Sequence, residues 1–247
     1  IELVKKFYSW ELPEAVKWLK KYAGDYSITD TITKLVPEDY QILYKTLQPK
    51  LSQSSKAREY LKNRNLDYKK LAAGFNTGKE YDKLKYCIIF PLRSENDQVV
   101  SLYGRSIYDN AKCKHYYTAD RKGLYPCYPN PNTKQLIITE SIIDATTLQQ
   151  HFNLSSETSV LAAYGTNGLT PEHFKAILYL IKLENIVLWF DGDGAGSSAT
   201  DKYTKELKEL VPNVTISKVE MLEGEEINSL LDSHEPEILQ HLYEKRT

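Results

Sequence analysis

Apolar residues at helical spacing mark the first quarter of the chain. The first set, at i, i+3, i+4 and i+7, consists of Leu12, Ala15, Val16 and Leu19. The second set, which follows Pro37, consists of Tyr40, Leu43, Tyr44 and Leu47. This period predicts helices with one apolar face, and we expect a third short helix over residues 57–64. Residues 24–33 are small and polar, which indicates a connection between the first two helices.

The pattern changes near Tyr86. Residues 86–92 and 99–103 are short apolar runs, and the polar residues 94–97 between them are typical of a hairpin loop. We therefore predict a small, mostly β region over residues 86–130. The end of this region is rich in Tyr, Pro, Asn, Lys and Arg.

Strands and helices alternate over the second half of the chain. The predicted order is strand 135–139, helix 142–152, strand 159–163, helix 171–183, strand 186–190, helix 197–210 and strand 214–219. Strands that alternate with helices of this length form a parallel sheet with helices on both faces. The predicted fold class is therefore α/β, with a parallel sheet flanked by helices, preceded by a mixed α+β basic subdomain and N-terminal helices.

The helix over residues 171–183 has the clearest sequence signals. Thr170 can cap it, and Pro171 suits the first helical turn. Its apolar stripe is formed by Phe174, Ile177, Leu178 and Ile181.

Charge is balanced overall but uneven along the chain. The sequence has 32 Lys and Arg residues and 33 Asp and Glu residues. Residues 45–70 carry eight basic and two acidic residues, whereas residues 220–247 carry two and eight. A basic flank and an acidic tail can orient a polyanion, although each segment alone is equally compatible with a solvated helix face.

The three cysteines, Cys87, Cys113 and Cys127, are an odd number in unrelated settings, which favours a reducing compartment over a disulfide framework. Cys113 and Cys127, with His115, lack the second close pair that a zinc site needs. The longest apolar runs are too short to span a bilayer. We therefore expect a cytoplasmic protein without a membrane partner. Because the first residue is Ile1 and not an initiator Met, we also expect the chain to be part of a longer protein.

Two of the predicted strands end in carboxylates. Strand 135–139 leads to Glu140, with Asp144 one helical turn further on, and strand 186–190 leads to Asp191 and Asp193. Ligands collect outside the carboxyl ends of parallel strands. Carboxylates this close repel each other unless a cation lies between them, and hard oxygen ligands suit Mg²⁺ or Mn²⁺. The sequence thus predicts a divalent-metal site at this edge of the sheet.

The same residues also allow a structural interpretation. Asp-Gly-Asp-Gly at 191–194 is an ordinary turn sequence, and Glu140 can cap the helix that follows it. Their occurrence at two strand ends of one sheet favours the metal site. A third acidic cluster, Glu223, Glu225 and Glu226 with Asn228, follows the last strand and is either an outer metal site or the polar start of the final helix.

These motifs resemble the Toprim domain, which bacterial primases, type IA and type II topoisomerases and some nucleases share. The rest of the chain resembles the polymerase core of bacterial DnaG-type primases. The matching segments, in order, are residues 57–61 with Arg64, 89–93, 104–105, 114–117, 122–125, 140–144, 163–166, 190–196 and 224–228. The likeness covers about residues 57–232, and the ordered set is far more specific than any single motif.

The resemblance implies four parts of the chain. Residues 1–24 resemble the helix that closes the family's N-terminal zinc-binding module, 25–132 the N-terminal subdomain of the core, 133–222 the Toprim domain, and 223–247 a C-terminal helical tail. The zinc ligands of that module are absent from this sequence, so no zinc is expected. The chain also has Ser141 where the family has Gly, and Asn228 where it usually has Asp.

The resemblance implies a DNA-directed RNA polymerase, a nucleotidyltransferase that makes short RNA primers on single-stranded DNA during replication. The implied catalytic residues are Glu140, Asp144, Asp191 and Asp193. The implied ligands of Mg²⁺ or Mn²⁺ are Glu140, Asp191, Asp193 and Glu226. The residues implied to bind nucleic acid or nucleotide are Arg93, Arg105, Lys114 and Lys122. The implied partners are the DNA template, ribonucleoside triphosphates, a replicative helicase and a zinc-binding module.

Three tyrosines lie among these basic residues, namely Tyr116, Tyr117 and Tyr125. They either stack on bases or simply pack, because the chain has 19 tyrosines.

Two other functions would use the same fold. A Toprim nuclease or topoisomerase fragment would use these acids to cleave phosphodiesters, but it does not account for the segments 90–93 and 104–105. A catalytically silent nucleic-acid-binding replication module would keep the fold with a decayed site, and Asn228 favours that interpretation.

Overall fold

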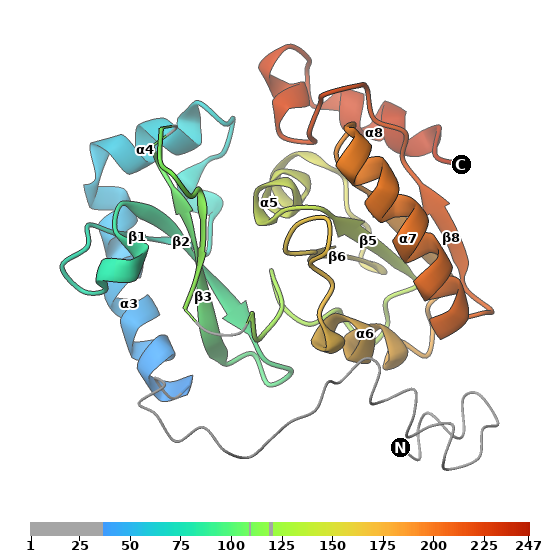
Figure 1. Cartoon of the computed structure of the whole chain (residues 1–247), viewed down its shortest axis with the longest axis horizontal. Helices are drawn as coiled ribbons and strands as arrows, with labels where there is room; N and C mark the ends of the chain where they lie inside the picture. Colours follow the sequence, from blue (N-terminus) through green and yellow to red (C-terminus); the bar gives the residue numbers. More distant parts are fainter. Residues whose placement is uncertain (1–36, 109, 119–120) are drawn as a thin grey trace.

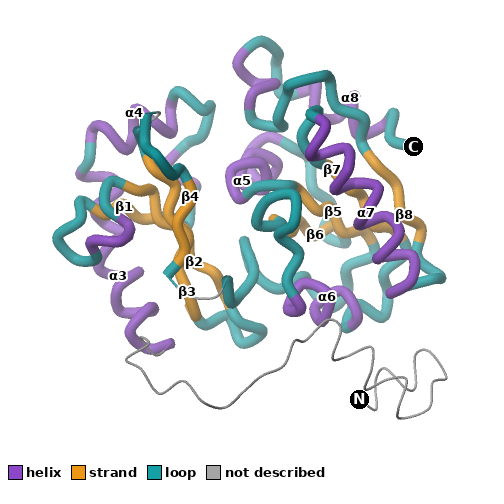
Figure 2. Tube along the Cα trace, viewed as in Figure 1, coloured by secondary structure: helices purple, strands orange, loops and turns teal. Residues whose placement is uncertain are grey.

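The computed structural model describes residues 37–108, 110–118 and 121–247 of the 247-residue chain. This part forms two units, each built on a four-stranded sheet (Figures 1 and 2). The helix predicted after Leu12, the connection 24–33 and the predicted unit 1–24 lie outside the described residues.

The first unit is an antiparallel sheet with helices packed against it. Its strands, in their order across the sheet, are β1 (Gly74–Asn76), β2 (Cys87–Arg93), β3 (Val99–Ser106) and β4 (His115–Tyr117). Helix α3 (Pro37–Gln53) contributes Tyr40, Tyr44 and Leu47 to a buried cluster with this sheet, as the helical spacing predicts. Helix α4 (Ser55–Lys62) follows, and the Ser54 side chain caps it by accepting a hydrogen bond from the Ala57 amide.

The predicted hairpin is confirmed, since β2 and β3 pair antiparallel with Phe90 opposite Tyr103. Pro91 lies inside β2 although proline has no N–H to donate to a sheet. Strand β1 pairs only with residues 87–89, so among the described strands β2 has no neighbour on that side at Pro91. The sheet therefore accommodates this proline, as edge positions do.

The second unit is a parallel sheet with the strand order β6-β5-β7-β8. Its strands are β5 (Gln135–Thr139), β6 (Thr158–Ala162), β7 (Asn185–Trp189) and β8 (Thr215–Lys218). The chain passes from β5 to β6 on one side and then crosses to β7 on the other side of β5. The winding direction therefore reverses between β5 and β7, and ligand crevices open at such points in α/β sheets.

Helices cover both faces of the parallel sheet, as predicted. They are α5 (Ile142–His151), α6 (Pro171–Leu178), α7 (Gly194–Leu210) and α8 (Glu237–Glu244). Alternate residues of β5 point to opposite faces. Ile137 belongs to a buried cluster with residues of α5 and α8, and Leu136 and Ile138 belong to a cluster with residues of α6 and α7.

The prediction of one helix over residues 171–183 is wrong at its end. Helix α6 ends at Leu178, and Ile181 is 82% exposed instead of continuing the apolar stripe. Leu180 and Leu183 are buried in its place, because the chain leaves the helix in a turn that leads into β7. Helix α7 begins three residues earlier than predicted, since the Asp193 side chain caps it.

The two units share a buried cluster. Leu61 of α4 and Phe90 of β2 belong to it together with Ile143 and Leu148 of α5. Beyond the shared cluster, the Asn65 side chain donates a 3.0 Å hydrogen bond to the main-chain oxygen of Leu231, in the short helix η3 (Ser229–Asp232). The packing therefore fixes how the two sheets face each other. No helix in the described ranges is both long and apolar enough to cross a membrane.

Candidate active site

A cleft of about 480 Å³ lies between the two units, which stand side by side in Figure 1. Its acidic residues, Glu140, Asp191 and Glu226, come from the second unit. Its basic residues from the first unit and the connection that follows it are Arg64, Arg105, Lys114 and Arg121. The cleft thus places carboxylates beside cations that suit a polyanion.

Glu140 and Asp191 are brought together by the register of two parallel strands. The last residues of β5 and β7, Thr139 and Trp189, are neighbours across the sheet. Glu140 follows directly after β5, and the Asp191 amide donates to Glu140 Oε2 at 3.4 Å. The juxtaposition that the sequence predicted at this edge is therefore present.

Burial, with a contribution from neighbouring carboxylates, raises the pKa values of Glu140 and Asp191. Burial, followed by the charges of Asp144 and Glu140, raises the pKa of Asp191 to about 8. Burial also raises the pKa of Glu140, and the charges of Asp193 and Glu226 add to this shift. Oxygen donors that repel one another are suited to a hard divalent cation, which would relieve the repulsion. The donor set of this cleft therefore fits Mg²⁺ or Mn²⁺.

Asp144 lies behind the cleft and is only 1% exposed. Its carboxylate accepts hydrogen bonds from Ser141 Oγ at 2.5 Å and from the main-chain N–H of Asn228 at 3.1 Å. Burial, followed by the charge of Glu226, raises the pKa of Asp144 to about 7. Asp144 therefore influences the site through charge and through its neighbours, and does not line the cleft.

Asp193 and Glu226 already have partners in the described structure. Asp193 is exposed, and its Oδ1 accepts from the Gly196 amide at 2.6 Å, which caps α7. The structural interpretation had placed a helix cap at Glu140, but Ser141 caps α5 instead. Glu226 lines the cleft and forms a 3.1 Å ion pair with Arg64. Among the described residues, no three acidic, histidine or cysteine side chains gather as a ready-made metal ligand set. Water and substrate oxygens would have to complete the coordination.

Gly196 lets α7 begin directly beneath Asp191. A Cβ atom at Gly196 would lie 2.2 Å from the main-chain oxygen of Asp191, far inside contact distance. This glycine therefore permits the close approach of helix and strand end that positions Asp191.

Asn228 lies in the core of the molecule and is 2% exposed. Its Nδ2 donates to the Arg64 main-chain oxygen at 2.8 Å and to Thr147 Oγ1 at 2.9 Å. Its Oδ1 accepts from Arg64 Nη1 at 3.0 Å. An aspartate could not make the first two bonds, because a carboxylate only accepts. Asn228 therefore joins the turn that follows α4 to α5, and it holds Arg64 at the cleft.

The predicted basic residues divide into two groups. Arg105 and Lys114 line the cleft. Arg93 lies on the β2–β3 hairpin, where it forms a 3.3 Å ion pair with Asp97. Lys122 is exposed, and its main-chain oxygen accepts from Ser101 Oγ. Neither Arg93 nor Lys122 lines the cleft, and their contacts with nucleic acid stay predictions.

The tyrosines also divide. Tyr125 is 3% exposed and its hydroxyl is hydrogen-bonded to Thr146, so the packing interpretation is correct for this residue. Tyr117 lines the cleft, with the Arg121 guanidinium 5.0 Å from its ring centroid. Tyr116 is partly buried against the cluster beneath α3.

Three basic or histidine residues of the cleft were not predicted as site residues, namely Arg64, His115 and Arg121. Arg64 and His115 lie in segments that carried the family resemblance, and His115 was considered only as a partner of two cysteines in a zinc site. Arg121 follows two residues that the structure does not describe, and no motif marks it. Cys113 donates to the main-chain oxygen of His115 at 2.9 Å, so this cysteine and histidine are not arranged as metal ligands.

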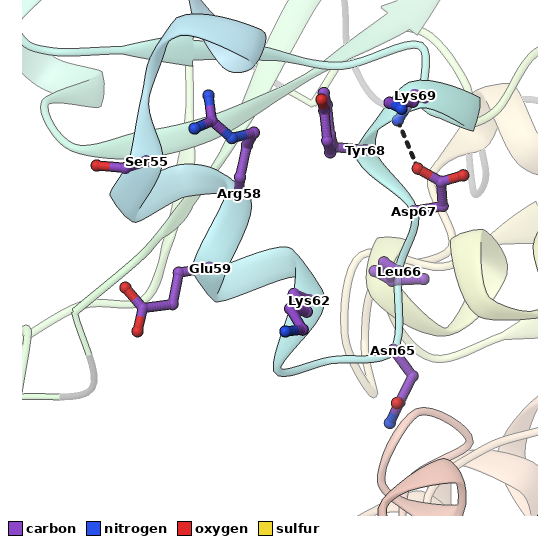
Figure 3. Close-up of a pocket in the computed structure, with 9 residues that line it drawn as sticks. All are labelled: Ser55, Arg58, Glu59, Lys62, Asn65, Leu66, Asp67, Tyr68 and Lys69. Atoms are coloured by element: carbon purple, nitrogen blue, oxygen red, sulfur yellow. Dashed lines mark hydrogen bonds between the residues drawn. The ribbon is translucent and has the colours of Figure 1, made fainter.

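Residues of the basic segment 45–70 line a second, open pocket beside α4 (Figure 3). Arg58, Lys62 and Lys69 line it together with Glu59 and Asp67. Asp67 Oδ1 accepts from the Lys69 amide at 3.0 Å and so caps the short helix η1 (Tyr68–Lys70). This pocket shares no residue with the cleft, so the basic segment contributes side chains to two separate sites.

Residues 137–231 match the Toprim-like family. The DNA primase of Neisseria meningitidis serogroup A is 31% identical over 134 residues, which is 50% of this chain and 21% of that protein. The DNA primase of Pseudomonas aeruginosa is 29% identical over 180 residues, or 67% of this chain and 26% of that protein. The chain thus spans about a fifth to a quarter of the length of these relatives.

Solved structures show the same fold. The structure of a DnaG primase catalytic domain bound to single-stranded DNA matches with a TM-score of 0.68 at 19% identity, covering 85% of this chain and 78% of that one. The parallel sheet flanked by helices therefore has the fold of solved primase catalytic cores.

Proposed function

This chain has the fold of the bacterial DnaG-type primase core and resembles DNA primases in sequence, and from that premise we propose that it synthesises RNA primers. The reaction would be DNA-directed transfer of ribonucleotides. The primer 3′ oxygen would bond to the α-phosphorus of the incoming nucleotide, and the bond from that phosphorus to pyrophosphate would break.

One observation carries this proposal. Glu140 and Asp191, from the ends of two neighbouring parallel strands, share a cleft with Arg64, Arg105 and Lys114 from the other unit. Phosphoryl transfer needs little covalent chemistry from the protein, and it depends on positioning and on neutralising charge. In this cleft the carboxylates can bind cations and the basic side chains can bind phosphates, so the cleft can both position the reactants and neutralise their charge.

Glu140 and Asp191 would hold Mg²⁺ or Mn²⁺ in the cleft, with Glu226 and Asp193 as further ligands. The bound ions would neutralise charge on the triphosphate and on the leaving pyrophosphate. Glu226 could serve only if it loosens its ion pair with Arg64, which an incoming phosphate would attract. The choice between the two metals belongs to this proposal as well.

Glu140 has two possible roles under this proposal. It is either a further ligand or the group that accepts the proton of the primer 3′ hydroxyl, and burial, which raises its pKa, makes its carboxylate a better proton acceptor. Asp144 would act through Ser141 and Asn228, which it contacts, to fix the start of α5 beside Glu140.

The proposed partners follow from the same chemistry. Single-stranded DNA and ribonucleoside triphosphates would bind the basic side of the cleft. One structural match is titled as the zinc-binding and RNA polymerase domains of the Aquifex aeolicus primase, with a TM-score of 0.67 at 17% identity. We propose that a zinc-binding module and a replicative helicase act with this chain, and that it functions in the cytoplasm.

Extension of a supplied RNA primer on a single-stranded DNA template tests the proposal. We expect extension with Mg²⁺ or Mn²⁺ and none with a chelator. Magnesium-dependent cleavage of labelled DNA without extension would instead support the nuclease alternative. Absence of both reactions, together with no Mg²⁺ or Mn²⁺ binding by calorimetry, would support a silent module and overturn the proposal.

A further inference from the structure

Arg105 is held on two sides in the cleft. Its Nε donates to Tyr60 Oη at 3.0 Å, and its Nη1 lies 2.8 Å from Nε2 of His115. Arg105 and His115 are also partners across β3 and β4, so the two backbones fix the distance between them. Tyr60 is on α4, in the first turns after the Ser54 cap. Two separate elements therefore position one guanidinium group.

The hydrogen bonds fix the tautomer of His115. A guanidinium group can only donate, so His115 Nε2 must accept from Arg105. A neutral ring then carries its proton on Nδ1, which lies 2.8 Å from Tyr103 Oη and donates to it. Tyr103 is 1% exposed, and its buried hydroxyl anchors the ring. Protonated His115 would lose the bond to Arg105 and would place two positive charges together.

Charge around the ring favours the same state. Desolvation in the cleft, followed by the charge of Arg105, lowers the pKa of His115 to about 4. The ring is therefore neutral at physiological pH, as the hydrogen bonds require.

The arrangement leaves Arg105 able to bind an anion. A guanidinium group has five N–H donors. The bonds to Tyr60 and His115 use one on Nε and one on Nη1, and the Tyr103 hydroxyl is a further hydrogen-bonding neighbour of this guanidinium. Three side-chain partners therefore leave N–H groups of Arg105 for a further acceptor. Arg105 lines the cleft, and a planar fork of donors matches a phosphate group.

We propose that His115 is a positioning residue that holds Arg105 in the conformation in which it binds a phosphate group. The phosphate would belong either to the DNA strand or to the incoming nucleotide. This inference rests on the proposed function, because it assigns a role within the same cleft. Without the His115 bond, Arg105 would have to order a long side chain at the moment of binding, which costs affinity.

Matched variants test the role of the His115 acceptor. His115→Gln keeps an acceptor that reaches Arg105, whereas His115→Asn is too short to do so. We expect His115→Asn to weaken phosphate binding roughly tenfold, the effect of losing one charge-assisted hydrogen bond. His115→Gln should recover most of that loss. Circular dichroism and the melting temperature confirm that each variant is folded.

Two readouts distinguish the two sources of phosphate. The Kd for a single-stranded oligodeoxynucleotide, measured by fluorescence anisotropy without nucleotide, reports the DNA strand. The KM for ribonucleotide in primer extension, compared with kcat, reports the incoming nucleotide. A tenfold change in either one supports the proposal and identifies the phosphate.

Arg105→Ala provides the decisive background. If His115 acts through Arg105, then adding His115→Asn to Arg105→Ala should change Kd and KM by less than about twofold, since the coupled pair is already broken. An undiminished effect of His115→Asn in that background would overturn the proposal, as would equal losses in the Asn and Gln variants. If the wild-type chain binds DNA but does not extend primers, the proposed function fails while the binding comparison still decides the role of His115.

Discussion

Asn228→Asp tests whether this residue is a structural link or a decayed metal ligand. The substitution keeps the shape of the side chain and replaces its NH₂ group with an oxygen. Two donors are lost, those to the Arg64 main-chain oxygen and to Thr147 Oγ1. Buried Asp144 accepts a hydrogen bond from the main-chain N–H of residue 228, so the new carboxylate would also lie close to the Asp144 carboxylate.

The expected loss of stability follows from these contacts. A buried acceptor without its donor costs about 1–3 kcal/mol. The Arg64 oxygen would lie near the middle of this range, and Thr147 near the bottom because its hydroxyl still donates to Ile143. The new charge is attracted by Arg64 and repelled by Asp144, so these effects oppose each other. We expect the free energy of unfolding to fall by about 3 kcal/mol at pH 7, or roughly 6–12 °C in melting temperature.

Urea denaturation followed by circular dichroism measures this loss, with the m-value as a check on two-state behaviour. Asn132→Asp is a matched control, since exposed Asn132 uses only its oxygen, as an acceptor from Lys182. The control should stay within about 0.5 kcal/mol of wild type. If Asn228→Asp were as stable as wild type and bound Mg²⁺ more tightly, Asn228 would be a lost ligand and not a structural link.

Three further changes probe the scaffold. Gly196→Ala should cost about 1–3 kcal/mol and displace Asp191, because its Cβ would meet the Asp191 oxygen; urea melts should show no comparable loss for Gly194→Ala, whose Cβ meets nothing within 4 Å. Asp193→Ala should lose about 1 kcal/mol with the cap of α7, whereas Asp193→Asn should retain it, and similar melts for both would argue against the cap. Burial lowers the pKa of His173 to about 4, from 6.5 in the unfolded chain. Between these pH values the unfolded state therefore binds more protons than the folded state. As pH falls from 7 to 4, wild type should therefore lose about 3 kcal/mol relative to His173→Gln, and parallel stability curves for the two would refute this.

The alternation of strands and helices could be predicted because each element carries its own apolar period. The proximity of Glu140 and Asp191 could be predicted as well, because the carboxyl ends of parallel strands lie at one edge of the sheet. Element ends were harder to predict. Ile181 continues the helical stripe in the sequence but is exposed, because α6 ends where the chain turns toward β7.

The basic side of the cleft could be predicted only in part. Arg105 and Lys114 were marked by motifs, but Arg93 belongs to the hairpin and is paired with Asp97. Which cations face the carboxylates depends on how α4 and the first sheet pack against α5, and no local pattern encodes that packing. The buried role of Asn228 has the same origin, since its partners lie in the turn after α4 and on α5, far away in the sequence.

Primer extension by Glu140→Gln and Asp191→Asn tests the central claim most directly. Both substitutions keep side-chain shape and remove a carboxylate from the cleft. We expect each to lower the rate of extension on a supplied primer by at least about 100-fold at saturating Mg²⁺, while the melting temperature and the Kd for single-stranded DNA stay near their wild-type values. Near-normal extension by either variant would contradict the assignment of this cleft as the active site.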